Sequence, residues 1–256
     1  MRIIVIRART LAAVAVGLVV CLCVGVLAVQ YFGGARMTAG QLEKHPIYSV
    51  DTQEAKVALG INCAWDNADI PKLISVLEQY NVKATFFVVG DWCDKYPESV
   101  KALYDAGHEI GSHSDTHADM AKLDEAGIVR ELEDSADKIE AITGRRPNLF
   151  RPPSGSYSSE MIAIVEREGF YPIQWDCDSI DYKDPTAAQM QERILKKLRN
   201  GSIMLFHSGA ANTPDALPQI IEAVRAKGYV FVPVSQLIYT GSYTVDYEGR
   251  QHVANE

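Results

Sequence analysis

The sequence predicts an α/β fold, a distorted barrel of about seven parallel strands with a helix between each pair. Apolar strand-like runs alternate with helix-like runs from residue 57 to residue 238. Because each crossover helix returns the chain to the same direction, this alternation indicates a parallel sheet. No glycine-rich nucleotide-binding loop accompanies it, so a closed barrel is favoured over an open sheet. The active site of such a barrel lies at the carboxyl ends of its strands.

The first half of the barrel is expected to hold three strands and three helices. The strands are the short apolar runs VALGIN (57–62), ATFFVVG (84–90) and HEIGSH (108–113). A helix over 70–80 has apolar residues at helical spacing and Pro71 in its first turn. Helices over 97–107 and 125–144 each end at a glycine, the usual residue after a helix.

The second half continues the alternation to residue 238. Strands are expected at NLFRPP (148–153), YPIQWD (171–176), SIMLFH (202–207) and the strand-rich YVFVPVSQLI (229–238). Helices are expected at 158–169, 187–201 and 216–228, and each of these segments ends in glycine. The barrel domain therefore spans residues 56–240.

The N-terminus predicts a membrane anchor over residues 1–35. Arg2, Arg7 and Arg9 precede an apolar run, 11–32, that is long enough to cross a bilayer as one transmembrane helix. The positive charge predicts a cytoplasmic N-terminus, and hence a single-pass protein of the cell membrane with an extracytoplasmic domain. The alternative is a cleaved signal peptide and a secreted protein. Residues 36–55 are expected to be a linker.

Composition narrows the classes of partner. The net charge is −8 and no basic patch is present, which argues against nucleic acid. Beyond the apolar segment the cysteines are Cys63, Cys93 and Cys177, an odd number that implies no disulfide framework. No protein partner is implied. Residues 241–256 show no periodic pattern and are expected to be a flexible C-terminal tail.

Polar residues gather where the predicted strands end. His113 and His117 are four apart, a spacing that lets two imidazoles share one metal ion. The other residues at or just after strand ends are Asn62, Arg151, Asp178, Asp181 and His207. Metal ligands, a cation, carboxylates and a further histidine together favour metal-assisted hydrolysis.

The segments VALGIN, ATFFVVG, GHEIGSHSDTH, FRPPSG, WDCDSIDY and IMLFHSG, in this order, resemble the polysaccharide deacetylase (NodB-homology) domain of carbohydrate esterase family 4. The resemblance covers about residues 57–237. It implies a distorted (β/α) barrel and a hydrolase that removes acetyl groups from a glycan polymer such as peptidoglycan or chitin. It also implies one divalent metal ion, for which zinc is the best candidate, held by an Asp-His-His set.

The resemblance carries over to individual residues. His113 and His117 match the metal-binding histidines, and Arg151 matches the arginine that orients the catalytic base. His207 matches the general acid, and Asp181 matches the carboxylate that tunes it. The backbone N–H of Ser154 is expected in the oxyanion hole. Tyr182 stands where the family often has tryptophan and is expected to bind substrate, whereas Trp175 is expected in the core.

The first motif departs from the family pattern. Asn62 stands in the place of the catalytic base and Cys63 in the place of the metal-binding aspartate. A longer variant of this motif fits CAWDNAD, with Asp69 preferred to Cys63 as the ligand and Asp66 close by. We expect an active deacetylase whose base is Asp66, Asp69 or metal-bound hydroxide. The alternatives are an impaired homologue that binds cell-surface glycan and a barrel whose metal only stabilises it.

Overall fold

The computed structural model describes residues 43–254. The predicted anchor over residues 1–35 lies outside these residues, as do residues 36–42 of the predicted linker. Within 43–254, none of the helices has the length and apolar character needed to cross a membrane.

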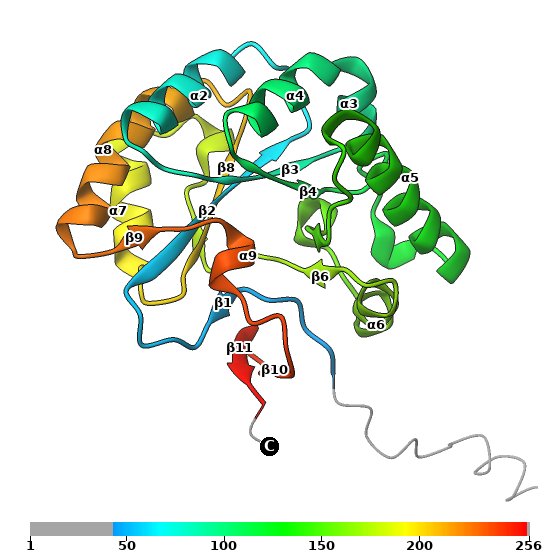
Figure 1. Cartoon of the computed structure of the whole chain (residues 1–256). Coiled ribbons are helices and arrows are strands. Elements are labelled where there is room, and N and C mark those ends of the chain that lie inside the picture. Colours follow the sequence, from blue (N-terminus) through cyan, green and yellow to red (C-terminus); the bar gives the residue numbers. More distant parts are fainter. Residues whose placement is uncertain (1–42, 255–256) are drawn as a thin grey trace, which may run out of the picture. The chain divides into compact units, whose positions relative to one another are not determined.

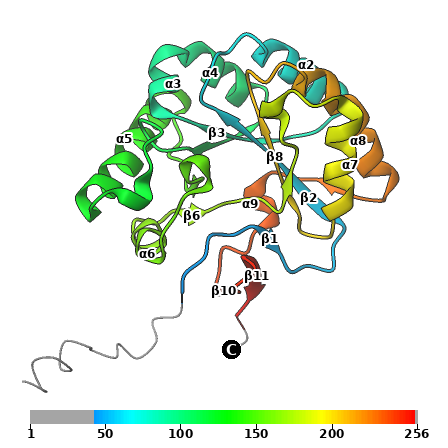
Figure 2. The same cartoon turned by 180° about the vertical axis from the view of Figure 1, so that it is seen from behind.

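A curled parallel sheet forms the centre of the fold (Figures 1 and 2). Its strand order is β6-β5-β4-β3-β2-β8-β7, and β9 also pairs with β2. The strands are β2 (Lys56–Cys63), β3 (Thr85–Val88), β4 (Glu109–Ser112), β5 (Leu149–Phe150), β6 (Tyr171–Pro172), β7 (Cys177–Asp178), β8 (Ile203–His207) and β9 (Val230–Phe231). All of their pairings are parallel, as the alternation of strands and helices predicts.

Helices cover the outer face of this sheet (Figures 1 and 2). They are α2 (Ile70–Gln79), α3 (Gly90–Lys95), α4 (Pro97–Asp105), α5 (Glu125–Thr143), α6 (Ser159–Arg167), α7 (Ala187–Lys197) and α8 (Thr213–Ala226). The short α9 (Val234–Leu237) packs elsewhere, in the apolar cluster that contains Ala58 and Phe87. Local sequence explains their bounds. Asp124 caps α5 by accepting a hydrogen bond from the N–H of Gly127, and Gly144 ends the helix with a φ of 73°. The short α3 was not expected.

The expected closure of the barrel is not complete. Only the first two residues of the predicted strand 171–176 form a strand, β6. The short strand β7 begins just after the predicted segment, and among the described residues β6 and β7 do not pair with each other. The segment before β2 lies in the gap, where Ile47 bridges to Ile173 and Ser49 to Ser202. The prediction of a linker is therefore wrong for this segment, in which Ile47 and Val50 are fully buried.

The expected flexible tail is also wrong. Residues of the C-terminal segment form β10 (Tyr243–Val245) and β11 (Arg250–Val253), which make a three-stranded sheet with β1 (Ser49–Val50) in the order β1-β11-β10. Gln251 is buried and exchanges hydrogen bonds with the backbone of Tyr239. The strand-rich segment 229–238 proves to be β9 followed by α9, because Pro233 ends the extended run.

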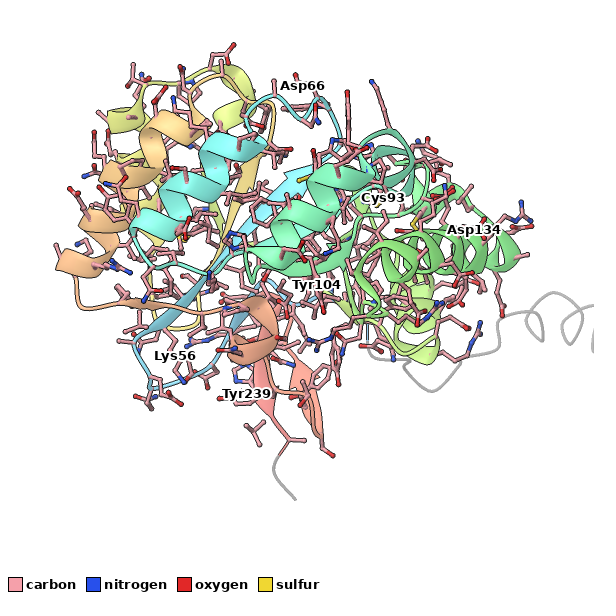
Figure 3. All side chains as sticks on the ribbon, turned by 45° about the horizontal axis from the view of Figure 1, so that its top comes forward. Lys56, Asp66, Cys93, Tyr104, Asp134 and Tyr239 are labelled. Carbon is pink, nitrogen blue, oxygen red and sulfur yellow. The ribbon has the colours of Figure 1, made fainter. Side chains whose placement is uncertain are left out.

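The two ends of β2 define the two ends of the sheet. Lys56 begins the strand, and Asp66 lies just beyond its carboxyl end, on the opposite side of the fold (Figure 3). The loops that follow β2, β4, β5, β7 and β8 gather at the end marked by Asp66, and these loops carry the polar residues singled out in the sequence.

Candidate active site

A pocket of about 300 Å³ opens at the carboxyl ends of the strands. It is lined by Asn62, Ala64, Trp65, His113, His117, Ser154, Trp175, Asp178, Tyr182, Leu205 and His207. The structure thus brings seven of the residues expected in the site to one surface. Arg151 and Asp181 are buried directly behind its wall, where they contact Asn62 and His207. Cys63, Asp66 and Asp69 are not part of the lining.

The two expected metal-binding histidines lie together. Their ring centroids are 5.0 Å apart. Nδ1 of His113 lies 2.7 Å from the carbonyl oxygen of Arg151. Because a carbonyl only accepts, Nδ1 carries the proton and Nε2 is left with its lone pair. Burial holds the pKa of His113 well below its usual range, so the ring is neutral, the form that binds metal.

The loop between these histidines is held by α5. Oε2 of Glu131 accepts hydrogen bonds from the backbone N–H groups of Asp115 and Thr116, each at 2.9 Å. Oε1 accepts a third from the Thr116 hydroxyl at 2.7 Å. Ser114 and His117 have φ values of 66° and 60°, a conformation that side chains rarely adopt. The Glu131 contacts fix this strained loop and hence the placement of His117.

His207 is held by a buried carboxylate. Its Nδ1 lies 2.7 Å from Oδ1 of Asp181, and its backbone N–H donates to Oδ2 at 2.6 Å. The hydroxyl of Thr213 also donates to Oδ2, at 2.7 Å. Asp181 is fully buried, and these donors satisfy both of its carboxylate oxygens. The arrangement fixes the ring and leaves Nε2 for the pocket, the geometry that a general acid requires.

Arg151 contacts the position of the missing base. Its Nη1 donates to Oδ1 of Asn62 at 2.9 Å, and its Nη2 donates to the carbonyl of Gln174 at 3.2 Å. The guanidinium lies 4.0 Å above the ring of Phe87. Gly60 makes room for it, since a Cβ at residue 60 would lie 2.5 Å from Nη2. Burial lowers the pKa of Arg151 to about 9, and no carboxylate pairs with it within residues 43–254.

The donor set fits a divalent metal ion only in part. His113 and His117 offer two nitrogen donors, but across 43–254 no group of three or more His, Cys, Asp or Glu side chains comes together. Cys63 belongs to the apolar core and burial raises the pKa of its thiol, so it is no ready thiolate ligand. Asp66 instead caps a local turn by accepting from the N–H of Ala68.

Asp69, the preferred third ligand, makes a different contact. Its Oδ2 accepts a hydrogen bond from the backbone N–H of Gly209 at 2.9 Å, which ties the loop after β2 to the loop after β8. Its Oδ1 is buried with no hydrogen-bond partner. Burial raises the pKa of this carboxyl, against the lowering effect of the Gly209 hydrogen bond. The Asp-His-His set expected from the sequence is therefore not assembled.

Aromatic side chains form much of the pocket rim. Tyr182, expected to bind substrate, is 45% exposed, and its ring meets the His207 ring edge-on. Trp175 packs against the core, as expected, but it also lines the pocket, which was not expected. Sequence reasoning missed Trp65, which is stacked on His207. A large apolar side chain directly after a strand end was the signal that could have revealed it.

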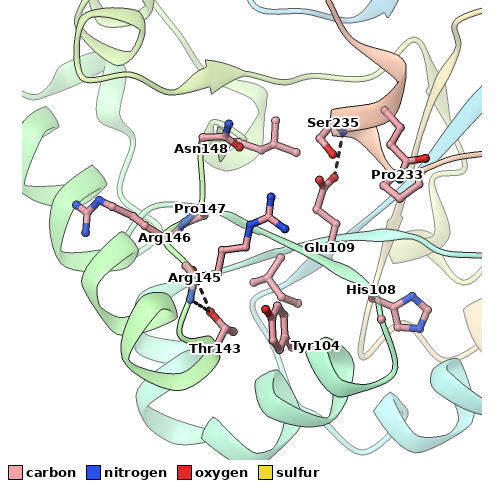
Figure 4. Close-up of a pocket in the computed structure, with 14 residues that line it drawn as sticks. Tyr104, His108, Glu109, Thr143, Arg145, Arg146, Pro147, Asn148, Pro233 and Ser235 are labelled. Atoms are coloured by element: carbon pink, nitrogen blue, oxygen red, sulfur yellow. Dashed lines mark hydrogen bonds between the residues drawn. The ribbon is translucent and has the colours of Figure 1, made fainter. Parts of the chain in front are cut away.

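A second cavity of about 180 Å³ lies at the other end of the sheet, where β4 begins (Figure 4). Its carboxylate, Glu109, already accepts hydrogen bonds from Thr85 and Ser235. The guanidinium of Arg146 is already paired with carboxylates of α5. These groups stabilise the amino-terminal face of the sheet, and the pocket around His207 remains the candidate active site.

Comparisons with known proteins agree with this geometry. Residues 49–173 match the family model described as polysaccharide deacetylase. The chain is 35% identical to YlxY of Bacillus subtilis (strain 168), over 77% of this chain and 61% of YlxY, less than two thirds of that protein. It is 30% identical to a peptidoglycan-N-acetylglucosamine deacetylase of Bacillus cereus, over 75% of this chain and 72% of that protein.

A solved structure with the same fold is that of wild-type BA3943, described as a CE4 family pseudoenzyme from Bacillus anthracis. It is 34% identical, covers 77% of this chain and 69% of its own, and has a TM-score of 0.73. A mutant of BA3943 with the same TM-score is described as having restored enzymatic activity.

Proposed function

Because this chain belongs to the polysaccharide deacetylase family, we propose that its pocket binds the acetylated sugars of a cell-wall glycan but releases their acetyl groups slowly or not at all. The observation that carries this proposal is the hydrogen bond from Arg151 to Asn62. This contact supports the proposal that Asn62 occupies the position at which the reaction would need a proton acceptor, and an amide does not take up a proton near neutral pH.

The aspartates considered as substitutes for the base do not compensate for Asn62. Asp66 and Asp69 are both absent from the lining of the pocket, and Asp69 is engaged by Gly209. The incomplete donor set for a metal ion points the same way. In the family this ion polarises the acetyl carbonyl and lowers the pKa of bound water, and two histidines without a third ligand hold it weakly.

Other parts of the machinery are retained, and they support binding of the same substrate. His207 with Asp181 presents a donor to the leaving nitrogen, and the backbone of Ser154 lies at the pocket wall with a φ of 55°. The rim of Trp65, Trp175 and Tyr182 suits the apolar faces of sugar rings. These groups recognise an acetylated sugar whether or not it is hydrolysed.

The experiment measures binding and hydrolysis in parallel. Wild-type protein is incubated with acetylated peptidoglycan and with chitin oligomers, with and without added zinc, and acetate is quantified while the bound fraction is measured by pull-down. We expect retention on at least one glycan with acetate release near background. Turnover on the order of 1 s⁻¹, in the ordinary range of enzymes, would contradict the proposal, as would a lack of binding to either glycan.

An active deacetylase is the second candidate, and one observation favours it. His207, Asp181 and the additional donor Thr213 are all in place. The protein keeps this arrangement although burying a carboxylate is costly. If this candidate is correct, wild-type protein releases acetate, and His207→Ala reduces that release by roughly a hundredfold or more.

We also propose that the domain faces the cell wall from the outer side of the membrane, with the apolar run 11–32 as its anchor. Fractionation with detergent and mass measurement of the mature chain test this. A soluble product that begins near residue 36 would favour the secreted alternative.

A further inference from the structure

Trp65 is exposed in a way that packing alone does not explain. The side chain is 48% exposed although it is one of the largest apolar side chains in the protein. Its ring lies parallel to that of His207, with an interplanar angle of 19° and a centroid distance of 5.2 Å. One face of the indole thus covers the imidazole, which leaves apolar surface free at the mouth of the pocket.

The position of Trp65 is fixed by contacts between two loops. The carboxylate of Asp69 accepts from the N–H of Gly209, as described above, and the N–H of Ser208 donates to the carbonyl of Asn62 at 2.9 Å. Gly209 has a φ of 80°, and a Cβ at this residue would lie 3.3 Å from Cβ of Trp65. The indole is therefore held against the His207 loop before any ligand arrives, which reduces the entropy lost on binding.

The surroundings of Trp65 suit one kind of ligand. Tyr182, also half-exposed, contacts the other side of His207, with a centroid distance of 5.7 Å. The pocket that these aromatic rings line also offers polar groups, among them Asn62 and Asp178. A pyranose ring has an apolar C–H face and a polar edge, so it can stack on an aromatic ring while its substituents reach such groups.

We infer that Trp65 is the specificity-determining residue of the pocket, a stacking platform for the pyranose ring whose acetamido group lies beside His207. The inference rests on the proposed glycan binding and assigns the contact with the sugar ring to Trp65. It also gives Asp69 a role, since this carboxylate positions the platform through Gly209. Asp69 is then a positioning residue rather than a metal ligand.

The test compares Trp65→Ala and Trp65→Phe with wild-type protein. The probe is tetrameric N-acetylglucosamine, and its fully de-N-acetylated form is the comparison ligand. Tyr247→Ala is the matched control, because Tyr247 is an exposed aromatic residue that does not line the pocket. Affinity is measured by calorimetry, folding by thermal unfolding, and the environment of the indole by tryptophan fluorescence.

We expect Trp65→Ala to weaken binding of the acetylated tetramer by about tenfold and Trp65→Phe to recover most of the affinity. Tyr247→Ala should bind as wild type does. The ligand-induced change in tryptophan fluorescence should be smaller in Trp65→Phe, with the remainder coming from Trp175, a result that a merely structural role of Trp65 would not produce. Equal affinity of Trp65→Ala and wild type overturns the inference while glycan binding stands. If wild-type protein binds neither tetramer nor polymer, the proposed function itself fails.

Discussion

At the scale of single residues, the pair of Asn62 and Arg151 decides what the pocket can do. Arg151 is a buried cation whose partner in the pocket wall is an amide oxygen rather than a carboxylate. A buried charge that lacks an opposite charge is costly, and here a hydrogen bond, a backbone carbonyl and the face of Phe87 compensate only part of that cost.

We expect Asn62→Asp to raise acetate release by roughly a hundredfold or more in the presence of added zinc, the range that a positioned general base supplies. The carboxylate would pair with Arg151, whose positive charge keeps it ionised at neutral pH. Acetate release from acetylated chitin oligomers is the measurement.

Asn62→Ala is the matched control for this prediction, because it removes the acceptor without adding a base. If Asn62→Asp is as slow as Asn62→Ala although both variants bind the oligomer, the missing base is not what limits the reaction. The incomplete metal site would then be the limiting feature.

The contact between Asn62 and Arg151 could be predicted from the sequence through the family resemblance, which matches these residues to the catalytic base and to the arginine that orients it. The partner of Asp69 could not. Asp69 lies several residues beyond the strand, and only the path of the loop after β8 brings Gly209 to its carboxylate. In the structure the expected ligand Asp69 accepts a hydrogen bond from Gly209, and among the described residues no third ligand joins the two histidines. The stacking of Trp65 on His207 depends on the same pair of loops.

At the scale of elements, α5 holds the loop that carries the two histidines. We expect Glu131→Ala to lower the free energy of unfolding by about 2 kcal/mol, because three hydrogen bonds to one carboxylate are lost and two backbone donors are left without a partner. Urea denaturation measures the effect.

Glu133→Ala is the control on the same helix, since Glu133 is more exposed and makes only a surface ion pair with Arg146. Cobalt binding followed by visible absorption adds a second readout of the histidine pair. A Glu131→Ala variant as stable as Glu133→Ala would show that the loop holds its shape without this carboxylate.

The three-stranded sheet of β1, β11 and β10 contains a group that responds to pH. Hydrogen bonds with Asp246, and then with Asp51, raise the pKa of His252 above its usual value, against the lowering effect of burial. Its protonated form is thus favoured in the folded state. The stability it contributes is complete below the unfolded pKa of about 6.5 and is lost as pH rises through the raised folded pKa.

We therefore expect the difference in thermal stability between wild type and His252→Gln to be largest near pH 5.5 and to shrink toward about pH 8.5. Unfolding temperatures of both proteins across this range are the measurement. Arg250, which also pairs with Asp51, is unchanged in the variant and keeps β11 attached to β1. A constant difference across the range would mean that His252 contributes by packing alone.

At the scale of the whole molecule, the segment before β2 fills the gap between the two ends of the curled sheet. The sequence did not reveal this, because its apolar residues are few and stand within a polar stretch. The shortening of the predicted strand 171–176 to β6, with β7 as a separate strand after it, was hidden for a related reason, since an apolar run has the same pattern whether its strand is continuous or interrupted. The central order of strands, by contrast, follows from the alternation of strands and helices.

A substitution at Gly201 tests how much the stability of the fold depends on the segment before β2. Its φ is 79°, and a Cβ there would lie 1.9 Å from the carbonyl oxygen of Val50. We expect Gly201→Ala to cost at least about 2 kcal/mol more than Gly228→Ala, measured as the free energy of unfolding. Gly228 has a φ of 89° but no atom within 4 Å of the added carbon, so it reports the backbone strain alone. Equal losses would mean that the segment moves aside without cost.

The segment in the gap also has a mechanical consequence. The carbonyl of Ile47 accepts a hydrogen bond from the N–H of Gln174 at 2.7 Å, and the carbonyl of Gln174 accepts one from Arg151. Tension applied to the chain before Ile47, as in a protein tethered by its first residues, would pull on Ile47. The force would reach Arg151 through one intermediate residue, Gln174. The hydrogen bonds between Ile47, Gln174 and Arg151 thus connect the chain before β2 directly to the wall of the pocket.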